Sequence, residues 1–414
     1  MTDALRLAIV GLNYAPEEIG IARYTADMAR ALATRGHAVS VISGKPYYPA
    51  WHVPQEWRGG WRKSVEDGVA ITRCPLYVPA QPSGMKRIIH LASYALSALG
   101  PAIRMARRDR PEVVFCIAPA LLSVPVAWIA ARLAGAKLWV HIQDFEVEAA
   151  FATGLVEQKG SLAKWGARAE AFLLGLADIV SSISPQMVAK LHEKGIAPHK
   201  TIEIRNWADS TIQPDPEQGA AYRAQWGLQG KKVCLYSGNI ANKQGIDILI
   251  EASRRLQGRE DIAFVICGDG PNRARLQELA LGLRNIQFHG LQPSARMGEL
   301  LGLATIHLLP QIPGAADLVL PSKLTNMLAS GRPVVATTEP GTGLFDEVDG
   351  CGICTKPGDA DALAQAIVKL ADDPQTCAEM AANGRERSVE RWSMRRIIDR
   401  LEARATLLAR GGGR

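Results

Sequence analysis

Short apolar runs alternate with amphipathic segments along the first half of the 414-residue chain. Residues 7–10 predict a buried parallel strand, residues 21–34 predict a helix that ends near Gly36, and residues 38–42 predict the next strand. This order of strand, loop, helix and strand is typical of a right-handed parallel crossover. Further strands are expected at 113–117, 138–142, 179–183 and 201–205.

The second half repeats this order after a segment rich in Asp, Gln, Pro and Gly. Strands are expected at 233–236, 263–267, 286–288, 306–309 and 334–337, with helices between them. The length also favours two domains. We therefore predict the α/β class, as two doubly wound Rossmann-like domains that face a central cleft. The expected segments are a first domain at 1–205, a linker at 206–230, a second domain at 231–390 and a terminal helical segment at 391–414 that crosses back to the first domain.

One uncharged run, residues 113–131, is long enough to span a bilayer. Pro119 and Pro125 divide it, however, so we interpret it as a soluble strand–helix–strand unit. The start of the chain is too short and too acidic for a secretory signal, and the seven cysteines are scattered. These features predict a cytoplasmic protein.

The net charge of +7 comes from the first 205 residues. Basic residues flank the apolar run 88–103, which predicts a helix lying on an anionic membrane surface, here the inner face of the cytoplasmic membrane. A buried helix with solvated ends is the alternative. The basic residues expected to meet the membrane are Lys86, Arg87, Arg104, Arg107 and Arg108.

A short helix is predicted after Pro321, with Ser322 as its N-cap and with Gly331 and Pro333 at its end. Ser322, Lys323 and Asn326 would share its polar face. The free amides of its first turn, its dipole and Lys323 together suit a diphosphate. The alternative is an ordinary capped helix that binds nothing.

Other candidate residues follow the ends of predicted strands. The loop 237–245 presents backbone amides with Asn239 and Lys243, and Gly20 allows a close backbone approach one turn before Arg23. His141 and Asp144 end another strand, where a functional and a structural role for the histidine are both open. The turn 268–271 is a weak signal by itself.

Several chemistries lack their sequence signature. Cys351 and Cys354 form a lone Cys-x-x-Cys pair without the second half of a zinc site, and packing is the preferred reading. Asp359 and Asp361 resemble the Asp-x-Asp motif of sugar-transferring enzymes, yet they open an amphipathic helix, so capping is preferred. Neither a dinucleotide Gly-x-Gly-x-x-Gly fingerprint nor a Gly-Lys-Ser/Thr loop is present. We expect no metal and no cofactor.

In this order, the motifs resemble retaining glycosyltransferases of family 4, which have the GT-B fold, and are most similar to the WcaI-like branch that makes colanic acid and related exopolysaccharides. The resemblance covers nearly the whole chain. It rests on residues 14–20, 35–37, 206–209, 238–247, 268–271 and 321–336.

The resemblance implies transfer of a sugar from a GDP- or UDP-linked donor to a polyprenyl-diphosphate-linked saccharide, with retention at the anomeric carbon and no required metal. His141 would contact the sugar or its leaving phosphate. The expected catalytic residues are His141, Asp144, Lys243, Lys323 and Asp317, and the expected acceptor-binding residues are Ile21 and Arg23. The expected donor-binding residues are Gly20, Gly238, Asn239, Gly268, Gly270, Leu291, Leu320, Pro321, Ser322, Leu324 and Asn326.

The sequence departs from the family pattern at four positions. The family's two glutamates correspond to Leu318, with Asp317 the nearest acid, and to Asn326. Its phosphate-binding arginine and lysine correspond to Asn239 and Gln244. Lys323 and the amino end of its helix are therefore expected to hold more of the diphosphate charge.

Two other functions fit parts of the sequence. A nucleotide-sugar 2-epimerase shares the fold and binds a diphosphate but needs no lipid acceptor. A nucleic-acid-binding protein would fit a pI near 9.0, but the basic residues lack interleaved aromatics, so no nucleic-acid partner is expected.

Overall fold

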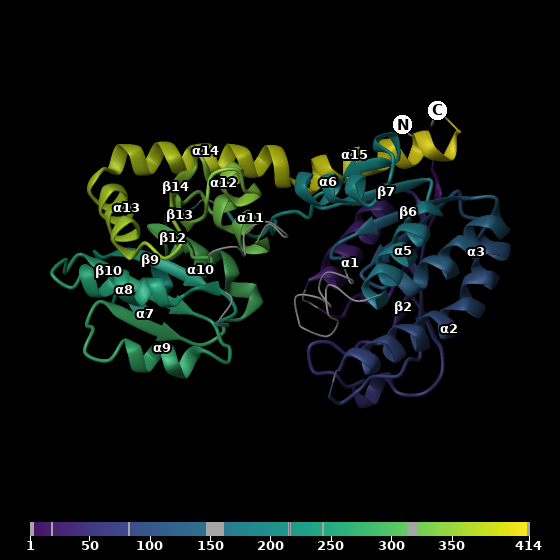
Figure 1. Cartoon of the computed structure of the whole chain (residues 1–414), viewed down its shortest axis with the longest axis horizontal. Helices are drawn as coiled ribbons and strands as arrows, with labels where there is room; N and C mark the ends of the chain where they lie inside the picture. The colour runs from purple at the N-terminus through teal and green to yellow at the C-terminus, as the bar shows by residue number, and fades with distance from the viewer. Residues whose placement is uncertain are drawn as a thin grey trace. The chain divides into compact units, whose positions relative to one another are not determined.

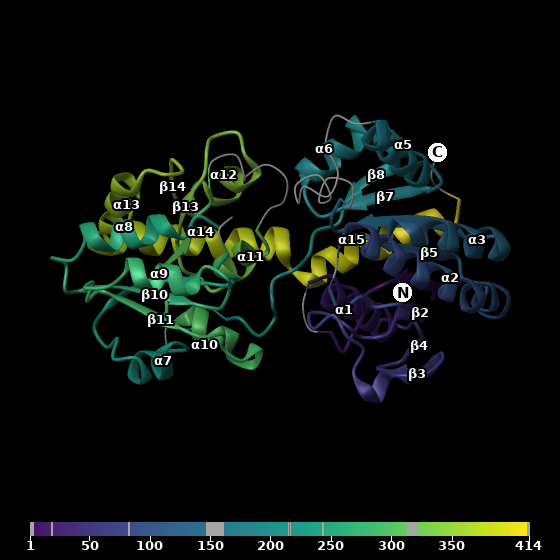
Figure 2. The ribbon, with the colours of Figure 1, turned by 60° about the horizontal axis from the view of Figure 1, so that its bottom comes forward.

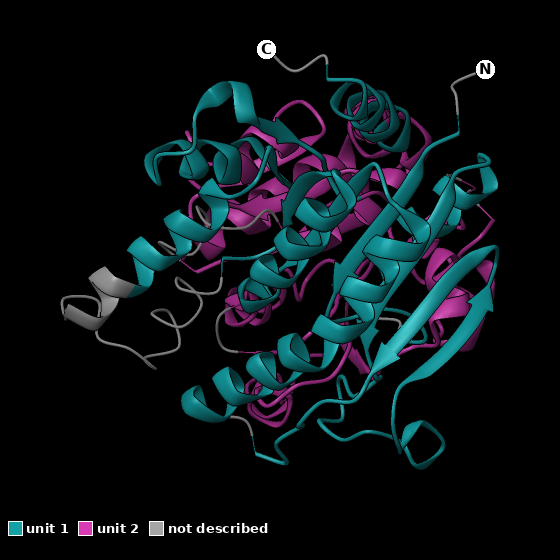
Figure 3. Ribbon diagram, turned by 90° about the vertical axis from the view of Figure 1, so that its right-hand side faces the viewer, with its two compact units in different colours: residues 1–206, 397–414 teal, residues 207–396 magenta. Residues whose placement is uncertain are grey.

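The computed structural model describes residues 4–17, 20–81, 83–145, 161–213, 215, 217–241, 244–312 and 321–411 (Figure 1). These residues divide into two compact units (Figure 3). Unit 1 runs to Asn206 and also includes the chain from Ile397 onward, and unit 2 spans Trp207–Arg396. Both are α/β units with a largely parallel sheet, as the sequence predicts.

Unit 1 is built on a sheet whose described strands follow the order β3-β4-β2-β1-β5-β6-β7-β8. All neighbouring pairs are parallel except β3 with β4. Since β2 and β5 lie on opposite sides of β1, the strand order reverses there, as in doubly wound folds. The strands are β1 (Arg6–Gly11), β2 (Ala38–Gly44), β3 (Arg62–Glu66), β4 (Val69–Cys74), β5 (Val113–Ala118), β6 (Lys137–Ile142), β7 (Ile179–Ser182) and β8 (Thr201–Glu203).

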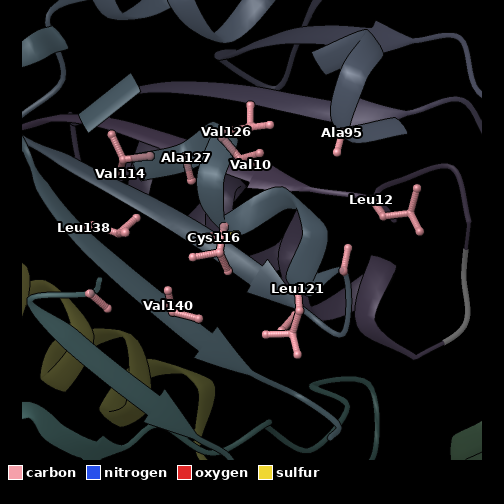
Figure 4. Packing of buried hydrophobic residues seen from close by; sticks show 14 of the residues in the cluster. Val10, Leu12, Ala95, Val114, Cys116, Leu121, Val126, Ala127, Leu138 and Val140 are labelled. Atoms are coloured by element: carbon pink, nitrogen blue, oxygen red, sulfur yellow. The ribbon is translucent and has the colours of Figure 1, made fainter. Parts of the chain in front are cut away.

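Helices connect these strands, and two of them, α2 and α3, cover one face of the sheet (Figures 1 and 2). Alternate strand residues such as Val114, Cys116 and Val140 meet a largely alanine-lined helix surface that includes Ala95 and Ala127 (Figure 4). Small side chains on the helices let them pack closely on branched strand residues. The helices of unit 1 are α1 (Ile21–Thr34), α2 (Gly84–Asp109), α3 (Val124–Ala134), α5 (Ser161–Gly175), α6 (Pro185–Glu193) and α15 (Met394–Ala409).

The uncharged run 113–131 forms β5 and the first part of α3, separated by a 3-10 turn at Leu121–Ser123. Pro125 lies in the first turn of α3, where its missing N–H is tolerated. No helix in the described ranges is both long and apolar enough to cross a membrane. The interpretation as a strand–helix–strand unit is therefore correct.

The terminal helix α15 belongs to unit 1 from Ile397 onward. Its apolar face, which includes Leu401, is buried. Next to this face, Glu402 contacts both Arg35, at 2.5 Å, and His37, at 3.1 Å. The turn between α1 and β2 is thus tied to the last helix of the chain.

Unit 2 has a parallel sheet with the described strand order β11-β10-β9-β12-β13-β14. The strands are β9 (Lys232–Ser237), β10 (Ile262–Cys267), β11 (Ile286–His289), β12 (Ile306–Leu309), β13 (Val334–Thr337) and β14 (Gly352–Thr355). The helices are α7 (Ala220–Gln225), α8 (Asp247–Arg255), α9 (Arg273–Leu279), α10 (Met297–Gly302), α11 (Ser322–Ala329), α12 (Gly343–Val348), α13 (Ala360–Asp372) and α14 (Pro374–Trp392).

The segment expected as a linker, residues 206–230, packs onto unit 2 instead. Ile212, Tyr222 and Leu228 are buried in one cluster with residues of β9 and β10. Gly219 lies so close to the backbone of Leu303 that a Cβ at this position would approach it to 2.4 Å. The turn-forming composition of this segment therefore does not indicate a free linker, because the apolar residues between the polar ones pack against unit 2.

Candidate functional site

Two glycine-containing loops meet at the carboxyl edge of the unit 2 sheet, after β9 and after β10. The N–H of Gly238 donates to Cys267 O at 2.9 Å, and the N–H of Ile240 donates to Asp269 O at 2.8 Å. A Cβ on Gly268 would lie 1.9 Å from Gly238 O, and one on Gly270 would lie 2.4 Å from Ile240 O. The close packing of the two loops therefore explains why glycine is needed at positions 268 and 270. Their expected role in donor binding stays a prediction.

Lys323 and Arg273 are cations at this edge, and Nη1 of Arg273 donates to the carbonyls of Gly268 and His289. The contacts of Lys323 lie at the end of β9. Its Nζ donates to the Tyr236 hydroxyl at 2.7 Å, and that hydroxyl donates to Asn239 O at 2.7 Å. The lysine side chain occupies the space that a side chain at position 238 would need, since a Cβ on Gly238 would lie 2.6 Å from Lys323 Cε. Burial lowers the pKa of Lys323 to about 8. The ammonium group is thus held in a partly dehydrated place, where an anion would interact with it more strongly than in water.

The helix that carries Lys323 differs from the prediction at its start. Pro321 occupies the N-cap position and Ser322 is already helical, with no side-chain cap hydrogen bond at this end. Ser322 as the N-cap is therefore wrong. The N–H of Leu324 donates to Pro321 O at 3.0 Å, while N–H groups in the first turn of an α-helix have no partner within the helix.

Leu324 and Asn326 also have structural partners. The Leu324 side chain is fully buried among residues of β12 and β13. Any contact of Leu324 with a donor would therefore come from its backbone, and its donor-binding role stays a prediction. Asn326 Oδ1 accepts the Asp209 N–H at 2.9 Å, which fixes the start of unit 2 to α11. Oδ1 keeps a second lone pair and the amide nitrogen carries two N–H groups, so the expected hydrogen bonds of Asn326 to a ribose stay a prediction.

The remaining expected donor residues are spread around this edge or lie outside the described residues. Asn239 is exposed in the loop after β9, and Leu291, which is 79% exposed, follows β11. The predicted catalytic residues Lys243 and Asp317, the donor residue Leu320 and the family position Leu318 lie outside the described residues. Gly238, Asn239, Tyr236 and Lys323 therefore form the part of the candidate site that can be described in unit 2.

His141 ends β6 in unit 1 and is buried, and both its ring nitrogens have partners. Nδ1 lies 2.8 Å from Ser181 Oγ, which also accepts the indole N–H of Trp139, and Nε2 lies 3.1 Å from the amide nitrogen of Gln143. Since Gln143 Oε1 accepts from Asn206 at 2.8 Å, its NH₂ group donates to His141 Nε2, and the imidazole proton is on Nδ1. Burial lowers the pKa of His141 to about 4. The ring is neutral at pH 7.

The expected contact between His141 and a sugar or phosphate would require one of these two hydrogen bonds to break. The sequence analysis did not identify Gln143, Ser181 or Tyr236 as site residues. A spacing of two residues along a strand places Gln143 and His141 on one face, which is a signal for the first of them. Ser181 is 40 residues from His141 and Tyr236 is 87 residues from Lys323, so no local pattern indicates those pairs.

The other expected residues of unit 1 lie at the carboxyl edge of its sheet. Gly20 precedes α1 with φ of 62°, where glycine is favoured, and nothing lies within 4 Å of the place its Cβ would take. Ile21 and Arg23 are in the first turn of α1, and Arg23 Nε lies 3.7 Å from Asp27. Asp144 is exposed, and its Oδ1 accepts the N–H of Phe145 at 2.9 Å.

The two motifs with a possible metal chemistry have structural roles. Asp359 caps α13 by accepting the N–H of Ala362 at 2.9 Å, and Asp361 pairs with Arg255. The capping prediction is therefore confirmed. All seven cysteines are free, with Cys351 buried and Cys354 partly buried. Within the described ranges no group of three or more potential metal ligands is present.

Helix α2 presents two different faces. Its buried side is made mainly of small residues and contacts the sheet and α3. The core interpretation of 88–103 is therefore correct for the buried side of this helix, and the membrane-facing interpretation stays a prediction for its exposed side. The exposed large apolar residues are Met85, Ile88, Ile89 and Leu96, and the basic residues at its two ends are Lys86, Arg87, Arg104, Arg107 and Arg108.

Two family models match the chain in succession. Residues 20–207 match a glycosyl transferase 4-like domain, and residues 220–387 match the glycosyl transferases group 1 model. These ranges fall largely within unit 1 and unit 2, respectively.

Solved structures share the fold at low sequence identity. The sucrose-phosphate synthase of Thermosynechococcus elongatus has a TM-score of 0.72 at 19% identity and covers 98% of this chain and 99% of its own. The Anabaena protein Alr3699/HepE, solved in complex with UDP, has a TM-score of 0.70 at 17% identity and covers 97% of this chain and 99% of its own. Both likenesses concern the fold alone.

Two proteins of similar sequence identify the family more narrowly. A colanic acid biosynthesis glycosyl transferase, WcaI of Escherichia coli strain K12, is 41% identical over 374 residues, which are 88% of this chain and 91% of that protein. The alpha-D-kanosaminyltransferase of Streptomyces kanamyceticus is 27% identical over 282 residues, which are 66% of this chain and 71% of that protein. With the two family models, these similarities show that the chain is a GT-B glycosyltransferase of family 4, in its WcaI-like branch.

Proposed function

We propose that this glycosyltransferase moves a sugar from a GDP- or UDP-linked donor to a polyprenyl-diphosphate-linked saccharide during synthesis of a colanic-acid-like exopolysaccharide. The 41% identity to a colanic acid biosynthesis enzyme supports the pathway. The observation that carries the donor assignment is Lys323, an ammonium group held in the first turn of α11 beside Gly238 and Tyr236. A diphosphate combines two negative groups that suit this cation and the amides of the helix start.

Charge stabilisation is the catalytic task of this site. As the bond from the anomeric carbon to the diphosphate breaks, negative charge grows on the leaving phosphate and positive charge grows on the sugar ring. Lys323 lies in a partly dehydrated environment, so it stabilises the leaving group more than an exposed lysine would. No metal is required in this scheme.

Retention follows if the acceptor enters on the face that the diphosphate leaves. The acceptor oxygen forms the new bond to the anomeric carbon, and its proton passes to an oxygen of the departing phosphate. Orientation of the two substrates then supplies much of the remaining rate enhancement. Ile21 and Arg23 in the first turn of α1 are the proposed acceptor-binding residues, and Gly20, which precedes the helix, is a proposed donor-binding residue.

A lipid-linked acceptor places unit 1 at the inner face of the cytoplasmic membrane. The exposed apolar residues of α2 would enter the interface between head groups and acyl chains, and the basic residues at its ends would meet lipid phosphates. This arrangement keeps the protein peripheral. Anionic lipids supply the negative surface that the excess positive charge of the first half favours.

Donor binding is tested by thermal unfolding with UDP, GDP and ADP, each with magnesium and with a chelator. One of these ligands should raise the melting temperature, because it binds the native state alone. The Lys323→Met variant should lose this rise, while Lys356→Ala, an exposed lysine of the same unit, should keep it. Equal stabilisation of Lys323→Met and wild type by every nucleotide would contradict the proposed role of Lys323.

Membrane docking is tested separately by sedimentation with vesicles of phosphatidylcholine, with and without phosphatidylglycerol. The double change Ile88→Glu and Ile89→Glu should abolish binding to the anionic vesicles. Leu281→Glu with Val389→Glu, at two exposed apolar positions of unit 2, is the matched control and should bind like wild type. Retention of binding by the α2 variant would exclude docking through this helix.

The reaction itself is tested with the stabilising nucleotide as its sugar conjugate and a short-chain polyprenyl-diphosphate saccharide. NMR of the product reports the configuration at the anomeric carbon. A product with the donor's configuration is expected, and an inverted product would exclude the retaining mechanism.

A further inference from the structure

A cavity of about 300 Å³ opens between the carboxyl-terminal half of α2 and strands β2, β3 and β4. Its basic lining residues are Lys63, Arg104 and Arg108, and its acidic lining residue is Asp109. A shallow, open depression on the surface of α2 shares Arg104 and Arg108 and adds Arg107. The walls between these charges are apolar and include Val41, Ile71, Pro101 and Met105.

Most of the charge around the cavity is uncompensated. Lys63, Arg104 and Arg107 form no ion pair with any residue that the structure describes. Arg108 pairs with Asp109 at 2.6 Å, and the same carboxylate accepts the Ser40 hydroxyl at 3.1 Å. Neighbouring cations repel each other, so a bound anion would relieve an unfavourable arrangement.

The cavity is remote from the proposed catalytic edge. Since α2 connects β4 to β5, two strands that run in the same direction, it runs antiparallel to both, and its last turn lies at their amino ends. The hydrogen bond between Asp109 and Ser40, near the start of β2, agrees with this placement. His141 and Gly20 lie at the opposite, carboxyl edge. The cavity is therefore a separate site.

Trp61, two residues before the lining residue Lys63, is an amphipathic residue near this cavity. Pro101 lies inside α2 and has no N–H, so the carbonyl of Ser97 one turn earlier loses its helical partner. The indole N–H of Trp61 donates to this carbonyl at 3.0 Å, while 58% of the residue stays exposed. A tryptophan with its N–H satisfied and its ring uncovered is typical of a membrane interface. Val65 and Leu96, each 75% exposed, extend the apolar rim.

We infer that this cavity binds the head group of an anionic phospholipid, with the phosphate between Lys63, Arg104 and Arg108. This inference rests on the proposed docking of unit 1 on the membrane and adds a defined lipid site to it. A membrane lipid fits better than free phosphate, because the walls and the rim are apolar and continue into the exposed face of α2.

The charge contribution is tested with the double variant Lys63→Ala and Arg104→Ala in the vesicle assay. Removal of two cations at an anionic surface should weaken binding to vesicles that contain phosphatidylglycerol roughly thirty-fold. The matched control is Arg284→Ala with Lys356→Ala, two exposed cations of unit 2 with no ion-pair partner in the described chain. This control has the same net charge and should bind within about two-fold of wild type, since its changes lie outside α2 and the cavity.

The cavity itself is tested with a variant that keeps every charge. Ala70→Leu would fill the space from β4, and Thr72→Leu would fill it from the next position on the same face. We expect either variant to weaken vesicle binding about ten-fold. Circular dichroism and thermal unfolding identify any variant that fails to fold. If one variant does not fold, vesicle binding of the other one provides the test.

Soluble probes separate the two sources of phosphate. Short-chain phosphatidylglycerol, below its micelle concentration, should raise the melting temperature of wild type and not of Ala70→Leu. Glycerol 3-phosphate should have no such effect, and stabilisation by it equal to that by the lipid would overturn the lipid assignment.

The outcomes also separate this inference from the docking proposal. One outcome is that both cavity-filling variants bind vesicles as strongly as wild type, while the Ile88→Glu and Ile89→Glu variant does not bind. This outcome would refute the lipid site but leave the proposed docking through α2 intact. Absence of wild-type binding to anionic vesicles would refute both.

Discussion

Lys323 should make diphosphate binding depend on pH in a way that few other residues of unit 2 could produce. In the free protein, burial lowers the pKa of Lys323 from 10.5 to about 8. A bound diphosphate beside the ammonium group would raise this pKa again. Binding and protonation are then linked, and the affinity must fall as the pH rises through the pKa of the free protein.

The expected size follows from the charged fraction of Lys323. With a free pKa of about 8, roughly three quarters of the molecules carry the charge at about pH 7.5 and about 3% carry it at about pH 9.5. If the bound pKa returns to its ordinary value near 10.5, the affinity should fall roughly twenty-fold between these two pH values. A terminal phosphate is already ionised throughout this range.

Isothermal titration with UDP and GDP measures this effect, in buffers that differ in ionisation enthalpy. Wild type should take up about half a proton per bound ligand near pH 8. Lys323→Arg stays charged, so any change in its affinity between pH 7.5 and 9.5 measures the ionisation of the nucleobase and of groups other than residue 323. Lys323→Met should bind weakly and show only this same background change, and the fall in wild-type affinity should exceed it. A wild-type profile that matches that of Lys323→Met, with no proton uptake, would refute the reasoning.

Three further outcomes test the packing arguments. Gly268→Ala should lower the free energy of unfolding in urea by about 2 kcal/mol or more, because its Cβ would meet Gly238 O at 1.9 Å, whereas Gly258→Ala, with open space around it, should be nearly neutral. Asp359→Asn should keep both stability and activity, because asparagine can also cap α13. Asp359→Ala should lose about 1 kcal/mol of stability and keep its activity. Loss of activity in the Asn variant would favour a metal-ligand role. Leu401→Ala should cost about 2 to 5 kcal/mol, while Leu407→Ala on the exposed side of the same helix should cost well under 1 kcal/mol in the same assay.

Most of the parallel strands could be predicted, because they consist of continuous apolar runs. The parallel strand β4 (Val69–Cys74) was missed, since Thr72 and Arg73 interrupt its apolar run. β5 was expected at 113–117 and forms at Val113–Ala118, where all six residues are buried. The antiparallel strand β3 was missed, since four of its five residues are polar and it lies at the sheet edge. The turn Asp67–Gly68, with φ of 51° and 78°, does carry a hairpin signal that hydrophobic periodicity ignores.

Helix α14 was missed for a related reason. Over nineteen residues it buries only Gly384, Ser388 and Trp392, so it has no continuous apolar stripe. At the candidate site, the short helix could be predicted from its local signals, although its N-cap is Pro321. The position of the Lys323 side chain could not be predicted, because it depends on the absence of a side chain at Gly238, which is far away in the sequence.

At the carboxyl edge of the unit 2 sheet, fewer backbone N–H groups are available to a ligand than the glycines of its loops suggest. The N–H groups of Gly238, Ile240 and Gly268 donate to Cys267, Asp269 and His289 carbonyls at 2.8 to 3.0 Å. These amides are committed to joining the loops, so they cannot also surround a phosphate without breaking the packing. In the first turn of α11 the N–H of Leu324 donates to Pro321 O, whereas the N–H groups of Ser322 and Lys323 have no acceptor within the helix, and the Lys323 ammonium group is held at the same edge. In the described part of unit 2, we therefore expect the proposed diphosphate to be bound mainly through α11, and we expect the titration of Lys323 to control its affinity.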